Sequence, residues 1–175
     1  MLGYLDESYE ARSLYVLVLV PGAAHDDRRR AALRALLLGD GQRLHTSKEK
    51  KVKRRLRLSE SVAELDVRPV VAVRESRDAL ERARGFCLSA LAWHVEGIDE
   101  FVFERRGSHL DAQDKRRLAR MGRHHGPRIA ARFMHPEDEP MLWVADIVAA
   151  AVFQDLFRGN PIYRAAIGPI TLLDC

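Results

Sequence analysis

Two apolar runs near the start of the chain predict an antiparallel β-hairpin. Residues 2–7 form a short strand pattern that reaches the acids Asp6 and Glu7, and residues 13–20 read SLYVLVLV, which is apolar almost throughout. A polar turn separates the two runs. Because a strand without polar positions is expected to be covered on both faces, the hairpin is predicted to lie inside a sheet.

Further along the chain, apolar residues at helical spacing alternate with short strand-like runs. The sequence predicts helices over about 28–38, 47–65, 76–98, 111–124 and 141–157, and further strands over 66–74, 100–104 and 128–134. This order is typical of an α/β domain with a mixed sheet, in which an antiparallel first hairpin is followed by crossover connections.

No linker interrupts residues 1–175, so a single domain is expected. The residues after Gly159 carry two prolines and predict an irregular apolar tail, which could pack on a second copy as a homodimer.

Composition narrows the class of protein. Of the 175 residues 47% are hydrophobic and 31% are charged, as expected for a folded globular chain. The longest apolar stretches, near 14–24 and 141–153, fall short of the roughly 20 residues that a membrane span needs. Acids precede the first apolar run where a secretory signal would carry basic residues, and two cysteines make no disulfide framework. We therefore expect a cytoplasmic protein without a membrane partner.

Basic residues are concentrated in two segments of the chain. Residues 43–57 hold eight Lys and Arg against one acid, and residues 105–128 hold eight against two acids, within a net charge of +4. Such clusters are typical of proteins that bind polyanions, although solvated helix faces can show the same pattern. The candidates to hold a nucleic-acid backbone are Lys48, Lys50, Lys51, Arg54, Arg105, Arg106, Lys115 and Arg116.

The last predicted helix carries an isolated charge. Between Met141 and Phe153 its only ionisable residue is Asp146. Because a helix that is apolar nearly all round is buried, Asp146 is predicted to point inward. A buried carboxylate without a partner is either protonated or strongly destabilising. An arginine, a hydrogen bond to a neighbouring strand, or a bound cation would each satisfy it.

Two further carboxylates stand where predicted strands end. Asp6, with Glu7 beside it, follows the first strand, and Glu104 closes the strand EFVFE. Taken alone, each of these acids could be a solvent-exposed carboxylate at the end of a strand. Together with Asp146 they are expected to converge, and three converging carboxylates stay ionised only beside a cation. Oxygen ligands select Mg²⁺ or Mn²⁺, and two such ions can hold both the attacking and the leaving oxygen of a phosphodiester. His135, after a predicted strand, is the candidate to shuttle a proton to the leaving oxygen.

Three stretches of the sequence, YLDES, FVFE and PMLWVADIVAAAV, resemble an uncharacterised bacterial family, domain of unknown function 3800. The resemblance covers about residues 2–155 in order. It implies a ribonuclease-H-like fold, in which acids on strands and on a helix hold two metal ions. Asp6 matches the first-strand aspartate and Asp146 that of the last helix. Glu104 stands where relatives often have an aspartate, and Trp143 where a glutamine is usual.

The residues and the resemblance together predict a metal-dependent nuclease that cleaves phosphodiester bonds in DNA or RNA. Asp6, Glu104 and Asp146 would bind Mg²⁺ or Mn²⁺, with Glu7 assisting. The departures at Glu104 and Trp143 motivate an alternative, a catalytically inactive adaptor that binds nucleic acid or protein on the same fold.

Overall fold

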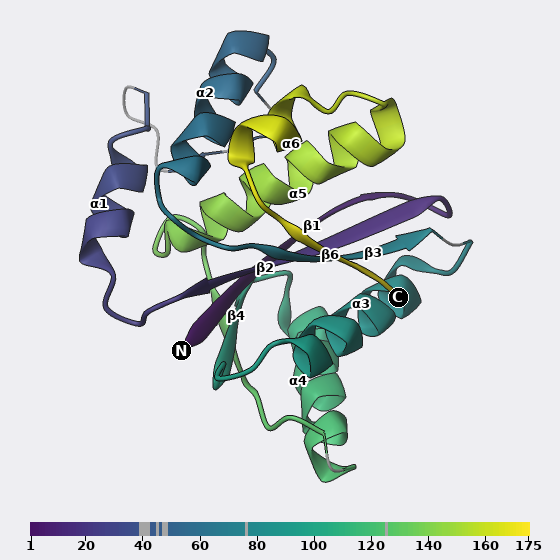
Figure 1. Ribbon diagram of the computed structural model, residues 1–175. Helices are drawn as coiled ribbons and strands as arrows, with labels where there is room; N and C mark the ends of the chain where they lie inside the picture. Colours follow the sequence, from purple (N-terminus) through teal and green to yellow (C-terminus); the bar gives the residue numbers. More distant parts are fainter. Residues whose placement is uncertain (39–42, 45, 47–48, 76, 125) are drawn as a thin grey trace.

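The computed structural model describes residues 1–38, 43–44, 46, 49–75, 77–124 and 126–175 (Figure 1). The strands are β1 (Leu2–Glu10), β2 (Leu14–Gly22), β3 (Val70–Glu75), β4 (Glu100–Glu104), β5 (Ala130–Met134) and β6 (Thr171–Asp174). The helices are α1 (Asp27–Arg34), α2 (Val52–Ala63), α3 (Leu80–His94), α4 (Ser108–Arg123), α5 (Met141–Arg158) and α6 (Ile162–Ile167). Within the described residues no helix is long and apolar enough to cross a membrane.

The strands form one mixed sheet of six, in the order β5-β4-β1-β2-β3-β6. β2 is the antiparallel neighbour of β1, to which a short turn joins it, and of β3, which follows in the sequence after α1 and α2. β4 runs parallel to β1, β5 runs parallel to β4, and β6 runs parallel to β3. The predicted fold class, a mixed sheet with an antiparallel N-terminal hairpin and flanking helices, is confirmed.

Helices cover both faces of the sheet (Figure 1). α1, α2, α5 and α6 lie on one face, and α3 and α4 lie on the other. β2 is apolar throughout because it contributes to both cores. Val16 and Val18 point toward α5, whereas Leu17 and Leu19 point toward α3, and all four are fully buried.

The first strand is longer than the sequence pattern predicts. β1 continues past Asp6 and Glu7 as far as Glu10 and is paired with β2 along its whole length. Its pairing with β4, however, stops at Leu5. Asp6 therefore lies within the hairpin but just beyond the part of β1 that has a neighbour on both sides.

Three helices are shorter than predicted, among them α3, which spans Leu80–His94 rather than about 76–98. α1 ends at Arg34 rather than near residue 38, although Asp26 caps its start as the acids there indicated, with Oδ1 accepting from the Arg29 N–H at 3.1 Å. α2 begins at Val52, and residues 49–51 before it are not helical; residues 47–48 lie outside the described residues. Charge does not explain this start, because the first turn of α2 itself holds Lys53, Arg54 and Arg55 and no acid.

The prediction of an irregular tail after Gly159 is wrong. The tail contains α6 and β6, and each element follows a proline, a residue that is tolerated at the start of a helix or a strand. Tyr163 and Ile167 of α6 are buried in the core beneath α5, and β6 pairs with β3. The tail is thus partly covered by its own chain, whereas Ile162 and Leu172 remain exposed, and the homodimer stays a prediction.

Candidate active site

Asp6 and Glu104 occupy neighbouring positions on one face of the sheet. β1 and β4 run parallel, and Leu5 is paired with Phe103, one residue before each acid. Successive side chains of a strand point to opposite faces. Leu5 and Phe103 pack toward α3 and α4, whereas Tyr4 packs toward α5. Asp6 and Glu104 therefore both face the α5 side, at the carboxyl ends of two parallel strands.

Asp146 reaches the same face from α5, which packs across β1 and β2 (Figure 1). Its neighbours Ala145 and Ile147 are buried, and Asp146 itself is partly buried. Its Oδ2 accepts a hydrogen bond from the backbone N–H of Thr46 at 2.9 Å. One oxygen of this carboxylate is thus satisfied by a loop residue rather than by a strand.

The electrostatics of Asp6 show that the three carboxylates influence one another. Burial and the negative charges of Glu7, Asp146 and Glu104 raise the pKa of Asp6 well above its usual range. The backbone N–H of Glu7 acts in the opposite direction, because it donates to the ionised form. The carboxylates predicted to converge are therefore close enough to oppose the ionisation of Asp6.

Glu104 is held by an arginine that the sequence did not indicate. Arg43 Nη1 lies 3.0 Å from Glu104 Oε1 and 3.7 Å from Glu137 Oε1. Arg43 and Glu104 are 61 positions apart, so no local spacing in the sequence could have linked them. In this arrangement the guanidinium neutralises part of the charge at the end of β4.

A small cavity of about 190 Å³ lies between Arg43, Glu104 and Asp146. It is lined by Arg43, Leu44, Glu104, Pro136, Leu142, Trp143 and Asp146. Trp143 is almost fully buried, and its Nε1–H donates to the Pro136 carbonyl at 2.7 Å. Trp143 therefore forms a wall of the cavity and fixes the segment between β5 and α5.

The negative charge and the oxygen donors of Asp6, Glu104 and Asp146 suit a divalent cation. Their arrangement suits one only in part. Carboxylate oxygens are the ligands that Mg²⁺ and Mn²⁺ prefer. The Thr46 hydroxyl beside Asp146 is buried without a hydrogen-bond partner among the described residues. Within the same residues, however, no group of three His, Cys, Asp or Glu side chains is already gathered around one metal position. Glu104 would have to leave Arg43 to complete such a group.

Glu7 does not join the other carboxylates. Strand alternation directs it to the face of the sheet opposite Asp6, where its Oε2 lies 2.7 Å from Nη1 of Arg84. Arg106 lies 3.7 Å from its other oxygen. This position corrects the expectation that Glu7 assists at the metal, because its charge is already compensated on the far side of the sheet.

Glu7 instead belongs to an ionic cluster beneath α3 and α4. We use this name for Glu7, Glu81, Arg84, Arg106, Asp114 and Arg117. Arg84 and Asp114, with side chains 1% and 0% exposed, form its centre at 2.9 Å. Burial alone would raise the pKa of Asp114, but Arg84 and Arg106 hold it below its usual range. The cluster is a structural feature that the sequence analysis did not predict.

The predicted nucleic-acid contacts fall on both faces of the sheet. Those with exposed side chains are Lys50, Lys51, Arg105, Lys115 and Arg116. Lys115 and Arg116 lie on α4, on the face opposite the three carboxylates, whereas Lys50 and Lys51 precede α2 on the same face. Arg105 directly follows Glu104.

Two of the other predicted contacts are held by the protein itself. Arg54 donates to the carbonyl of Leu36, and Arg106 lies in the ionic cluster. Lys48 lies outside the described residues. His135 is exposed and follows β5, so it stands at the same end of the parallel strands as Glu104.

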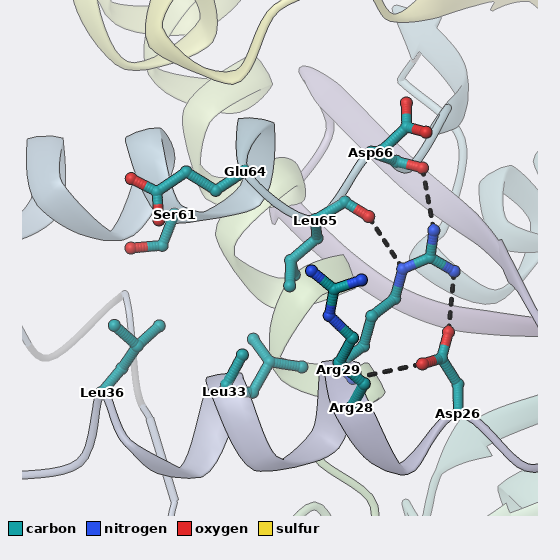
Figure 2. A pocket seen from close by; sticks show the side chains of 10 residues that line it. Asp26, Arg28, Arg29, Leu33, Leu36, Ser61, Glu64, Leu65 and Asp66 are labelled. Atoms are coloured by element: carbon teal, nitrogen blue, oxygen red, sulfur yellow. Dashed lines mark hydrogen bonds and ion pairs between the residues drawn. The ribbon is translucent and has the colours of Figure 1, made fainter.

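A larger hollow of about 520 Å³ lies between α1 and the end of α2, away from the carboxylates (Figure 2). Several of its polar groups are bonded to one another through Arg29. Arg29 donates to the carbonyls of Leu65 and Asp66 at 2.7 and 3.0 Å and to the Asp26 carboxylate at 2.8 Å. This arginine joins the start of α1 to the end of α2, which gives the hollow a structural role.

Replacing Asp6 by Asn is expected to stabilise the metal-free protein at neutral pH. The raised pKa means that the folded state holds the Asp6 proton more tightly than the unfolded state does. Stability from this group is therefore highest near pH 4 and falls as the pH rises through the folded-state pKa. Urea unfolding in EDTA should show Asp6→Asn gaining stability over the wild type between pH 4 and pH 7. A constant difference in the free energy of unfolding across that range would contradict the raised pKa of Asp6.

Comparisons with known proteins bear on the fold. A scan against protein-family models found no match, and a search of curated proteins found none. Among solved structures, a chain from the structure of the PCNA:RNase HII complex from Archaeoglobus fulgidus is similar, with a TM-score of 0.55 and 14% sequence identity over 86% of this chain and 70% of that chain. Together with the mixed sheet and its flanking helices, this likeness shows that the chain has a ribonuclease-H-like fold.

Proposed function

We propose that this protein is a divalent-metal-dependent nuclease that hydrolyses phosphodiester bonds of DNA or RNA, and that it is a relative of the domain of unknown function 3800 family. The observation that carries the proposal is the placement of Asp6, Glu104 and Asp146 on one face, where burial, Glu7 and the charges of Asp146 and Glu104 raise the pKa of Asp6. The similar chain comes from a complex that contains RNase HII, and this supports the same class of activity.

Asp6 and Asp146 would hold the metal, which is Mg²⁺ or Mn²⁺. When bound, such an ion polarises a phosphoryl oxygen and makes a water molecule more acidic. Glu104 joins the other two acids when it separates from Arg43. An incoming phosphate offers Arg43 another anionic partner, so the arrival of substrate favours this separation. The Thr46 N–H fixes the orientation of the Asp146 carboxylate throughout.

His135 and the exposed basic residues complete the proposal. His135 stands beyond β5 at the same end of the sheet and would supply a proton to the leaving oxygen. Lys50, Lys51 and Arg105 would contact phosphates without reading bases, which makes binding weaken steeply with salt. Lys115 and Arg116, on the opposite face, would contact only a strand that wraps around the sheet.

Manganese is expected to raise the melting temperature of the wild-type protein by about 5–10 °C at an ion concentration near 100 times its Kd. Asp6→Asn should abolish this rise, because the ion loses a charged ligand. The measurement is differential scanning fluorimetry with and without MnCl₂, and nuclease activity is assayed in the same samples. Glu10→Gln, an exposed carboxylate further along β1, is the matched control and should respond as the wild type does.

The inactive adaptor is the second candidate, and the Arg43–Glu104 ion pair favours it. An adaptor would keep this pair closed permanently. It would then bind nucleic acid or protein in a salt-sensitive way, show no stabilisation by Mn²⁺, and cleave neither DNA nor RNA. That combination of results would select the adaptor over the nuclease.

A further inference from the structure

The two cysteines of the chain meet in the folded protein. Cys87 lies on α3 and is fully buried, and Cys175 follows β6 and is partly buried. Their Sγ atoms are 3.0 Å apart, although the residues are 88 positions apart in the sequence. We propose that Cys87 and Cys175 are a site of reversible oxidation, at which a small-molecule disulfide converts the two thiols into an intramolecular disulfide. This inference is independent of the proposed nuclease activity.

Both sulfurs are held in place by ordered structure. The backbone N–H of Cys175 donates to the Val73 carbonyl at 3.1 Å, and Arg74 Nη1 donates to the Cys175 carbonyl at 2.5 Å. Cys87 is fixed by the packing of α3 against the sheet, beside the buried side chain of Leu88. A disulfide requires the sulfurs to approach to about 2.05 Å. The remaining movement of about 1 Å is within the reach of side-chain rotation.

The two thiols differ in their readiness to react. The hydrogen bond from Cys87 lowers the pKa of the Cys175 thiol, and the nearby Arg74 guanidinium lowers it as well. The same hydrogen bond, together with burial, raises the pKa of the Cys87 thiol. Since the thiolate is the nucleophile in thiol–disulfide exchange, Cys175 attacks the oxidant first and Cys87 completes the disulfide.

The reaction balances as an exchange with an oxidant RSSR, of which oxidised glutathione is an example. The Cys175 thiolate attacks one sulfur of RSSR, which forms a Cys175–SR mixed disulfide and releases one RS⁻. Cys87 then attacks Cys175 Sγ, the bond to SR breaks, and a second RS⁻ leaves. The two protons lost by the cysteines give two RSH, and two electrons pass from the protein to the oxidant.

The disulfide would tie the last strand of the sheet to α3. β6 has four residues and lies at the edge of the sheet, where β3 is its one partner among the described residues. A short edge strand of this kind is prone to separate from the sheet. Because a cross-link over a long loop restricts the unfolded chain, oxidation is expected to raise the melting temperature by about 5–15 °C.

The test uses the full chain, treated with oxidised glutathione and then unfolded in the presence of iodoacetamide. The proposal predicts a monomer without alkylated cysteine whose melting temperature is raised, and both changes are reversed by dithiothreitol. Two alkylated cysteines after oxidation, or disulfides only between chains on a non-reducing gel, would overturn it.

Single variants test the assigned order of attack. Cys87→Ser should gain one glutathione at Cys175, whereas Cys175→Ser should gain none, because Cys87 is fully buried. The opposite pattern of masses would overturn the roles of the two thiols. Neither variant touches the three carboxylates, so each should keep the Mn²⁺-dependent behaviour of the wild type.

Discussion

Replacing Asp146 by Asn is expected to lower the rate of Mn²⁺-dependent phosphodiester cleavage by about a thousandfold or more, because a metal ligand stabilises the transition state by several kcal/mol. Asparagine has nearly the same shape, and its amide oxygen can still accept the hydrogen bond from the Thr46 N–H. The substitution therefore removes the charge with little change in packing. Initial rates on end-labelled DNA and RNA oligonucleotides, with an EDTA blank, measure the effect.

The matched control for this variant is Asp155→Asn. Asp155 lies on the same helix, and its carboxylate pairs with Arg164 at 2.6 Å instead of facing the cavity. Asp155→Asn should retain the wild-type cleavage rate and should not alter the response to Mn²⁺ by more than the error of the assay. Cleavage by Asp146→Asn at the wild-type rate would show that the helix-borne acid does not hold a metal.

The second large effect is expected on stability, from replacing Arg84 by Met. This arginine is almost fully buried and lies between Asp114 and Glu7, so its loss breaks both ion pairs and leaves Arg106 and Arg117 as the remaining cations of the cluster. Breaking a buried ion pair by removing one member costs about 3–5 kcal/mol. For a chain of this length that corresponds to a melting temperature lower by about 6–20 °C. Urea unfolding and differential scanning calorimetry at pH 7 measure both quantities.

An exposed arginine provides the comparison for Arg84. Arg57 pairs with Glu60 and Glu64, but its side chain is 55% exposed. Exposed ion pairs contribute about 0–1 kcal/mol, so Arg57→Met should have little effect on the unfolding midpoint. If Arg84→Met is no more destabilised than Arg57→Met, the ionic cluster is not an important part of the folded state.

The strands and long helices were predictable because their patterns are strong. The apolar run of residues 13–20 requires cover on both faces, and the structure supplies it. The end of the chain was not predictable in the same way. Its prolines indicated a break in structure, but they stand before α6 and β6, and the partner of β6 is a strand about 100 residues earlier. Such a pairing depends on tertiary packing rather than on local pattern.

The candidate site was predictable only for those residues that have a local signal in the sequence. Asp146 is conspicuous as a single charge in an apolar helix, and that signal is local. Strand alternation could also have separated Asp6 from Glu7, because neighbours in a strand face opposite sides. Arg84 has a local signal that was missed: it falls on the buried stripe of α3, four residues before Leu88. Arg43 has none, since its contact with Glu104 is created by the fold.

The most direct test of the account is anomalous X-ray scattering from crystals soaked in MnCl₂. We expect a manganese peak between the carboxylates of Asp6 and Asp146, with Glu104 turned away from Arg43 and toward the ion. The same soak applied to Asp6→Asn crystals should give no peak at that position. A wild-type crystal without manganese there, in which Arg43 still pairs with Glu104, would contradict the claim that these acids form a metal site.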